Sequence, residues 1–356
     1  MMKSTLGLFI TVATFLPMPS YAELHSSVEV NNWKTECVGR YQISVPVEVE
    51  IALKNPKFFT RKRPKGIDID FDHNEFIFSD KSRALFSRLV TEGGEASVTP
   101  KLKKDEIANI KIEFNNRTQQ RIDQLRKEGD KDAADGIHVL NTNLHNGYMR
   151  VSRTGATIFI QYEDRIFNQS GGIENISGKY FAQSFLEHFR PRPLYTLPTQ
   201  PGVCIPYGFI ADDGTAPRDI GVTMRLIDHP DVEIYFRDTS SYLTGGTLHS
   251  PKDEIEYFWT IMYQKYTKLT EADFWGYRSI KMGGQAGKGM FVTIHRYDDS
   301  IDYGYIAVVS DNANLPSEML YVIRTAARAK GEPVSKDELK DIAEKIMASV
   351  KPHPVQ

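Results

Sequence analysis

Cysteine is scarce in this 356-residue sequence, which contains only Cys37 and Cys204. Cys-x-x-Cys pairs and metal-type cysteine spacings are therefore absent, which argues against a dithiol redox site or a zinc site. In an oxidising compartment the two thiols can form a disulfide, and the alternative is two separate buried thiols. A disulfide between them would close a long loop and contribute about 5 kcal/mol in the entropic account.

Long apolar runs are also scarce. One run extends from Leu6 to Leu16, too short for a membrane-spanning helix, which needs about 20 residues. Lys3 precedes this run, and the small residues Ser20 and Ala22 follow it. The pattern predicts a cleavable signal peptide over residues 1–22 and a periplasmic location, with an uncleaved anchor as the alternative. We expect no stable membrane insertion.

Neither sign of charge dominates the chain. It has 44 Lys and Arg against 46 Asp and Glu, a net charge of -2. This balance argues against nucleic acid or an anionic membrane surface as the partner. The hydrophobic share of 40% is enough to form a core, and the length predicts two domains.

Motifs for catalysis are missing as well. The sequence has no Gly-x-Ser-x-Gly or His-Glu-x-x-His motif. The segment GQAGKGMFVTIHRY (284–297) departs from a phosphate-binding loop, because Gly283 is one residue too close to Gly287 and Lys288 is followed by Gly289 rather than a hydroxyl residue. The glycines are instead predicted to form a hairpin turn. We expect no enzyme activity, no cofactor and no metal.

The two halves of the chain show a similar order of predicted elements. Each begins with a Cys-containing strand and continues with strands, a helix, strands and a helix. Helices are predicted from 104 to either Gly129 or Gly136, and over 178–193, 250–269, 317–331 and 335–350, the last with a capping box from Ser335 to Glu338. The expected fold class is α+β, with two related domains, each mainly antiparallel sheet with helices packed on it. Their predicted bounds are 23–190 and 202–356, joined by a stiff proline-rich linker over 191–201.

Several charged clusters could carry chemistry. His295 lies near Asp298 and Asp299 and could form an acid/base or metal cluster, but a solvated hairpin tip is the preferred interpretation. Asp212 and Asp213 are likewise predicted to lie in a turn. The basic segment RKRPK (61–65) is interpreted as a solvated turn rather than a nucleic-acid site.

Two segments carry a family resemblance. ECVGRYQISVP (36–46) and GVCIPYGFIADDG (202–214) resemble the domain-start signatures of the type VI secretion lipase-immunity family. The resemblance implies a periplasmic immunity protein whose two α+β domains seal the active-site entrance of a cognate class-four phospholipase effector. The matching positions are Cys37, Gly39, Arg40, Tyr41, Pro46, Gly202, Cys204, Gly208, Phe209 and Ile210.

The family motifs do not place the residues that contact the effector. Turns that combine acids and aromatics are typical of protein recognition. Two other functions fit the sequence: a periplasmic lipid- or small-ligand-binding protein, or a hydrolase that uses His295 or Asp299 as its base. The predicted partner interface consists of Asp212, Asp213, Tyr242, Asp298, Asp299 and Tyr303.

Overall fold

The computed structural model describes residues 32–46, 48–61, 76–84, 86–142, 146–173, 175–240, 250–262, 266–271, 276–310 and 316–353. The predicted signal peptide, Tyr242 and residues 62–65 of the basic segment lie outside these ranges. Within them, the longest helices are too short or too polar to cross a bilayer.

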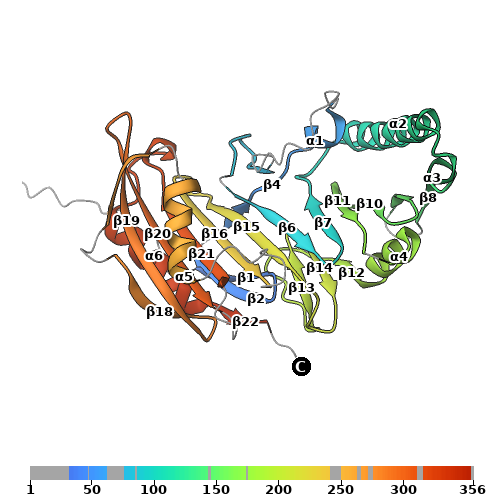
Figure 1. Cartoon of the computed structure of the whole chain (residues 1–356). Coiled ribbons are helices and arrows are strands. Elements are labelled where there is room, and N and C mark those ends of the chain that lie inside the picture. The colour runs from blue at the N-terminus through green and yellow to red at the C-terminus, as the bar shows by residue number, and fades with distance from the viewer. Residues whose placement is uncertain are drawn as a thin grey trace, which may run out of the picture.

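One antiparallel sheet of 14 strands organises the described part of the chain (Figure 1). Two of its strands lie off the main path, β18 (Arg278–Met282) beside β19 and β3 (Val49–Ile51) beside β15. The others follow the order β17 (Tyr266–Glu271), β19 (Gln285–Arg296), β20 (Ile301–Ser310), β21 (Pro316–Arg324), β16 (Val232–Thr239), β15 (Asp219–Leu226), β6 (Arg88–Thr91), β7 (Gly94–Val98), β11 (Arg165–Gly171), β10 (Ala156–Tyr162), β9 (Tyr148–Val151) and β8 (His138–Asn141).

Three small sheets complete the strand pairing. They bring together segments that are far apart in the sequence, since the first described strands pair with one near the C-terminus. The small sheets are β1 (Trp33–Val38), β2 (Tyr41–Pro46) and β22 (Lys351–Pro352); β12 (Phe189–Pro191), β14 (Gly208–Ala211) and β13 (Gly202–Ile205); and β4 (Leu53–Lys54) with β5 (Phe76–Ile77).

The large sheet crosses the predicted linker. Strand β15 follows the linker in sequence, yet Asp219 of β15 pairs with Val90 of β6, which precedes it. Backbone hydrogen bonds therefore join the two predicted halves. The mainly antiparallel α+β class is confirmed, whereas the division into two domains stays a prediction.

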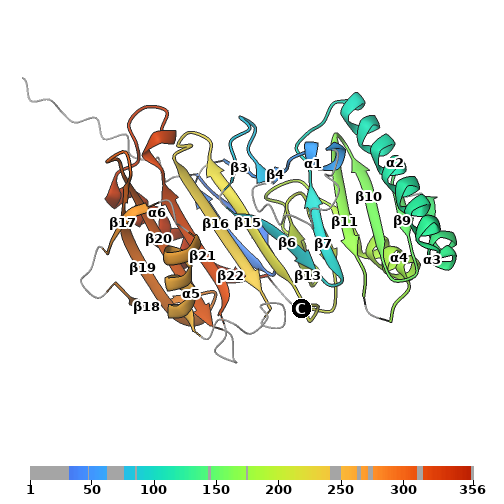
Figure 2. The same ribbon diagram turned by 45° about the horizontal axis from the view of Figure 1, so that its top comes forward.

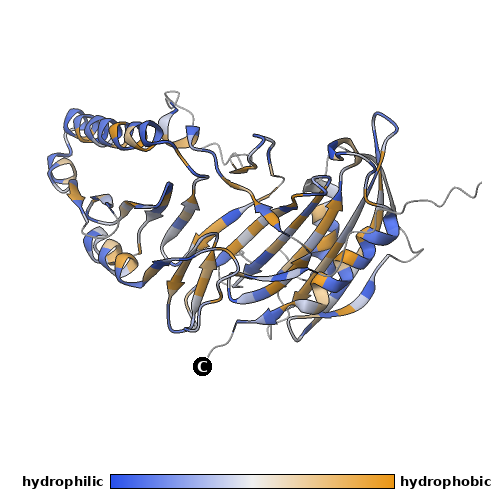
Figure 3. Ribbon diagram, turned by 180° about the vertical axis from the view of Figure 1, so that it is seen from behind, coloured by the Kyte–Doolittle hydropathy of each residue, from blue (hydrophilic) through white to orange (hydrophobic). Residues whose placement is uncertain are grey.

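Helices cover both faces of this sheet. Helix α2 (Lys104–Glu128) and helix α4 (Gly178–His188) lie on opposite sides of β9, β10 and β11 (Figure 2). Helix α5 (Pro251–Tyr257) and helix α6 (Lys336–Ser349) belong to separate apolar clusters on β20 and β21. Figure 3 shows hydrophobic strands in the middle of the sheet and a largely hydrophilic α2. The short helices are α1 (Lys57–Thr60), α3 (Lys131–Asp135), a π-helix (Phe258–Met262) and a 3₁₀ turn (Ala326–Arg328).

Three of the predicted helices are partly or wholly wrong. The helix predicted over 178–193 ends at His188, because Phe189–Pro191 pair with β14 as strand β12. Residues 317–331 form strand β21 and a 3₁₀ turn, because the apolar run from Leu320 to Ile323 is buried on both faces of the sheet between β16 and β20. Such a short run fits a buried strand or a buried helix equally well. Residues 250–269 are helical only to Met262, and β17 then pairs with β19. The helix over 335–350 and its capping box are confirmed.

A buried ion pair fixes the predicted linker. The Arg192 guanidinium lies 2.5 Å from the Glu36 carboxylate, and these side chains are 6% and 1% exposed. Arg192 also donates to five backbone carbonyls, including those of Cys37 and Gly208 at 3.1 and 3.2 Å. The Tyr195 N–H donates to Glu36 at 2.6 Å. The linker is thus held against β1 at several points.

The two cysteines form a disulfide beside this pair. Cys37 of β1 and Cys204 of β13 have Cα atoms 5.7 Å apart. A short β-bridge accompanies the disulfide, with Gly39 and Cys204 exchanging backbone hydrogen bonds of 2.8 and 2.9 Å. Gly39 has a φ of +57°, and a Cβ there would lie 2.3 Å from the Asp238 carboxylate, so glycine is required.

A second buried cluster joins β2 to the large sheet. Glu318 of β21 is paired in register with Asp238 of β16, and Tyr41 of β2 bonds to Glu318. Arg218 binds Asp238 at 2.6 Å. Burial is the main reason why the pKa of Glu318 is raised to about 7. The hydrogen bonds from Ser317 and Tyr41 oppose this rise, and the Asp238 charge adds to it.

We predict that Arg192→Met lowers the free energy of unfolding by about 3–5 kcal/mol, because it leaves the Glu36 carboxylate buried without its partner. Urea unfolding followed by tryptophan fluorescence measures the change. The matched control is Arg190→Met, an exposed arginine two residues earlier, which should change the free energy by about 0.5 kcal/mol. Equal losses in the two variants would contradict a special role for Arg192.

We predict a pH-dependent gain from Glu318→Gln. The raised pKa means that folding favours the protonated acid, so the contribution of Glu318 is complete below its unfolded pKa and is lost as the pH rises towards 7. At pH 8 the glutamine variant should therefore be more stable than the unmodified chain by up to about 3 kcal/mol, with little difference at pH 4. Thermal melts across this range, with exposed Glu332→Gln as control, check the prediction; parallel pH profiles would refute it.

Candidate partner-binding site

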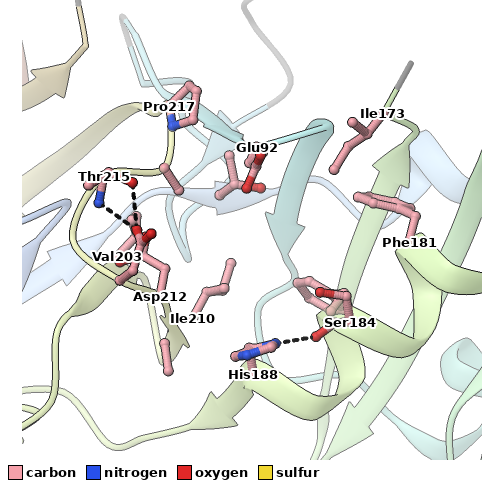
Figure 4. A pocket seen from close by; sticks show the side chains of 15 residues that line it. Glu92, Ile173, Phe181, Ser184, His188, Val203, Ile210, Asp212, Thr215 and Pro217 are labelled. Carbon is pink, nitrogen blue, oxygen red and sulfur yellow. Dashed lines mark hydrogen bonds between the residues drawn. The ribbon is translucent and has the colours of Figure 1, made fainter. Parts of the chain in front are cut away.

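The predicted turn at Asp212 and Asp213 borders a cleft. The turn follows β14 and leads into β15, and α4 and the turn after β6 form the opposite walls (Figure 4). The cleft has a volume of about 420 Å³. Its lining combines an apolar floor with a polar rim, a combination found in binding sites. The rim includes Glu92, Ser184, His188, Asp212, Asp213 and Thr215, and the floor includes Ile173, Phe181, Phe185, Val203 and Ile210.

The Asp212 side chain is fixed by hydrogen bonds to Arg40 and Gly214. Arg40 donates from both terminal nitrogens to its two carboxylate oxygens, at 2.8 and 2.6 Å. The side chains of Arg40 and Asp212 are only 8% and 15% exposed. The Gly214 N–H donates to the same carboxylate at 2.8 Å. Asp212 therefore fixes the course of the turn from within the cleft wall.

Asp213 faces the solvent instead. Its carboxylate accepts hydrogen bonds from the Thr215 hydroxyl at 2.6 Å and the Thr215 N–H at 2.8 Å. These bonds hold the pKa of Asp213 below its usual range, so the side chain carries a negative charge throughout the neutral region. The turn thus presents one fixed, exposed carboxylate at the cleft rim.

The polar groups of the cleft do not form a catalytic arrangement. His188 is bound through Nδ1 to the Ser184 carbonyl at 2.7 Å, which satisfies a free carbonyl near the end of α4. Within the described ranges, His188 has no hydrogen bond to a carboxylate, and no cluster of His, Cys, Asp and Glu could hold a metal ion.

The other predicted turn joins β19 to β20. Asp298 and Asp299 are exposed, and Asp298 accepts hydrogen bonds from the Ser300 hydroxyl and N–H at 2.6 and 3.1 Å. Tyr303 lies beyond the tip, where the Arg324 guanidinium stacks 4.4 Å from its ring centre. The exposed aromatic of this tip is Tyr297, which is 74% exposed and which the sequence prediction missed. Its position directly before the two aspartates was the available signal.

The structure does not bring the predicted site residues together. The Asp212 turn leaves a strand of a small sheet, whereas the Asp298 turn belongs to the edge region of the large sheet. The ribbons of β14 and β19 lie well apart in both views (Figures 1 and 2). The glycine-rich segment is a hairpin, with Gly283 and Gly284 in the turn at φ values of +59° and +87° and Gly287 already paired in β19. As an interface, the predicted set stays a prediction.

The fold and its clefts define an antiparallel α+β protein suited to binding, and comparisons with known proteins specify the family. Residues 196–354 match the family model described as the Tle cognate immunity protein 4 C-terminal domain. The matched residues include GVCIPYGFIADDG (202–214), so the resemblance of this part of the chain to the type VI secretion lipase-immunity family is confirmed, whereas ECVGRYQISVP (36–46) lies outside the matched residues. No curated protein matches the chain.

Solved structures share the fold along most of the chain. TplEi, a type VI secretion immunity protein from Pseudomonas aeruginosa in complex with an "L" peptide, superimposes with a TM-score of 0.55 at 15% identity, covering 92% of this chain and 100% of its own. Its apo structure gives 0.53 at 15% identity, with 93% and 100% covered. A chain of the Tle4–Tli4 complex gives 0.56 at 15% identity, with 92% and 100% covered.

We predict that Asp212 and Asp213 differ in their effects on stability. Asp212→Ala should lower the free energy of unfolding by about 3 kcal/mol, because it leaves the Arg40 guanidinium buried without its carboxylate. Asp213→Ala removes only solvent-exposed hydrogen bonds and should melt near the unmodified chain. Calorimetry of both variants measures the difference, and similar melting temperatures would show that the Arg40–Asp212 pair does not hold the turn.

Proposed function

We propose that this chain is a periplasmic immunity protein that binds a cognate type VI secretion phospholipase effector and blocks it by covering its active-site entrance. The observation that carries the proposal is the family match over residues 196–354. The fold shared with TplEi and with a chain of the Tle4–Tli4 complex supports it. The predicted signal peptide supports the periplasmic location, where an enzyme that attacks membrane phospholipids would act.

The proposed mechanism is steric. A blocking protein gains affinity when its contact surface is rigid before binding, since less conformational entropy is lost. The disulfide, the Arg192–Glu36 pair and the Arg40–Asp212 pair supply that rigidity close to the Asp212 cleft. The exposed charge of Asp213 then orients the partner, because fixed rim charges steer association. In this proposal the two predicted domains grip the effector from both sides and the chain catalyses no reaction.

The proposal predicts stoichiometric inhibition. A purified candidate effector, sought as a Gly-x-Ser-x-Gly lipase encoded near this gene, should lose its hydrolysis of a fluorogenic phospholipid as the mature chain reaches one equivalent. Binding should be visible by calorimetry, and a tight complex should bury more than roughly 1,200 Å². Absence of binding would refute the immunity function, whereas tight binding without inhibition would refute only the covering of the active site.

Alanine substitutions test the two turns of the proposed contact surface separately. Asp213→Ala and Tyr297→Ala remove exposed side chains that no buried network needs, so a loss of affinity in either reports a lost contact with the effector. The exposed Glu332→Ala serves as a surface control. Unchanged affinity in both test variants would remove these two turns from the interface.

A further inference from the structure

The lining of the Asp212 cleft carries charge of one sign above its apolar floor. The described residues that line it include three acids, Glu92, Asp212 and Asp213, but neither lysine nor arginine. The volume of about 420 Å³ lies near the lower end of the range for ligand pockets, about 300–1,000 Å³. A cleft of this size can take one or two side chains of a partner.

Two of the three acids are available to such a partner. Asp212 is paired with Arg40 inside the cleft wall. Both hydrogen bonds from Thr215 end on the same oxygen of Asp213, Oδ1, so Oδ2 keeps its lone pairs for another donor. Glu92 is exposed, and within the described ranges neither Glu92 nor Asp213 forms an ion pair. Figure 4 shows Glu92 between the turn that carries Asp212 and the apolar side chains of the opposite wall.

The backbone that carries Glu92 is fixed on the apolar floor. Glu92 and Gly93 form the two-residue turn between β6 and β7. Gly93 has a φ of +78°, and a Cβ there would lie 2.6 Å from the Ile173 side chain and 2.8 Å from the Phe181 ring, so both side chains pack directly on the turn. The Gly172 N–H donates to the Gly93 carbonyl at 2.6 Å. The Glu92 carboxylate is therefore attached to a well-supported turn beside the floor.

His188 of α4 adds a neutral acceptor to the rim. Its Nδ1 bonds to the Ser184 carbonyl at 2.7 Å. A carbonyl oxygen only accepts, so Nδ1 carries the hydrogen and Nε2 of the neutral ring is an acceptor. The rim thus offers acceptors from three elements: the β6–β7 turn, the β14–β15 turn and α4.

We propose that this cleft binds an arginine side chain of the effector protein, with the guanidinium between Glu92 and Asp213 and a neighbouring apolar side chain on the floor. The inference rests on the proposed immunity function and deepens it by naming the group that the cleft receives. A guanidinium has five N–H donors and no acceptor, which matches a rim of acceptors. It is also more weakly hydrated than an ammonium, and its aliphatic stem can lie along apolar surface.

A protein side chain fits the cleft better than a small cation. Within the described ranges, no group of three His, Cys, Asp or Glu residues could hold a metal ion. Free arginine carries its own carboxylate, which the acids of the rim would repel. A polyamine has the right charge, but it supplies no bulky apolar group for the floor of Phe181, Phe185 and Ile210.

Charge reversal tests the proposal. In the full mature chain, Glu92→Lys combined with Asp213→Lys should weaken binding of the candidate effector by about tenfold or more, measured by calorimetry at low salt. Glu92→Lys alone should weaken binding in the same direction and leaves the hydrogen bonds of the Asp213 turn intact. The matched control is Glu187→Lys, the same change at an exposed position of α4 outside the cleft, which should leave the affinity unchanged. Thermal melts should show that all three variants remain folded.

A reciprocal exchange of charge identifies the arginine. Single surface arginines of the effector are changed to glutamate, and one of these variants should bind the unmodified chain about tenfold more weakly. The same effector variant should regain affinity for the Glu92→Lys chain, because the exchange restores a pair of opposite charges. If no effector variant regains affinity, the arginine contact is overturned.

Photo-crosslinking locates the contact independently. A photoreactive residue at Ser184, which lines the cleft, should capture an effector peptide that contains arginine, and one at the exposed neighbour Gln183, outside the lining, should not. Captured peptides without arginine would overturn the group that we name.

The remaining outcomes separate this inference from the immunity function. Unweakened binding by both Glu92 variants, with the unmodified chain still binding, overturns the cleft and leaves the immunity function standing. Failure of the unmodified chain to bind overturns both. Spermidine binding that requires Glu92, with the effector affinity unchanged in the same variant, would make the ligand a small cation and overturn the protein side chain.

Discussion

The buried pair between Arg192 and Glu36 is the constraint on which the rest of the structure depends. It lies beside the Cys37–Cys204 disulfide, and Arg192 binds carbonyls from β1, from the linker and from the β13–β14 hairpin. A guanidinium offers five N–H donors in a rigid fork, so it reaches acceptors on several segments from one position, whereas lysine offers three donors from a single nitrogen. The linker, which has little regular secondary structure, is thereby held in one position relative to β1 and to the β13–β14 hairpin.

Another set of ion pairs connects the large sheet to the protein surface. Arg40 donates through its backbone N–H to Asp238 and through its guanidinium to Asp212, so one residue connects the large sheet to the turn at the first cleft. Isolated buried pairs contribute little net stability compared with apolar residues, because desolvation offsets their attraction. In this protein the pairs fix the position of the turn. Separating either partner would leave a buried charge, so alternative conformations of the turn are strongly disfavoured. A preformed surface is what an inhibitor needs.

The sequence predicted an element correctly where residues within that element determine its conformation. Ser335 and Glu338 define the start of a helix by their own hydrogen bonds, and the glycines at 283 and 284 allow a turn that most residues resist. The segment 320–323 was assigned wrongly because its partners, β16 and β20, decide its conformation. The cleft between α2 and the sheet could not be predicted from the sequence. Arg121 and Arg150 belong to different predicted elements. They line the same cleft only because of the strand register and the course of α2.

The cleft under α2, which is lined by α2 and by strands β7, β9, β10 and β11, lies where one face of the large sheet changes from apolar to polar. Where both faces of the strands are apolar, helices α5 and α6 pack on them and form two apolar core clusters. Where strands β9 to β11 carry hydroxyls and an arginine on one face, a helix cannot dehydrate that face without leaving polar groups unsatisfied. Helix α2 packs through Phe114 on the rings of Tyr148 and Phe159, and the row of Arg150, Thr157 and Ser170 lies one pair further along the strands. The point at which the apolar alternation of three strands stops thus separates the residues that form the core from the polar residues that line the cleft under α2.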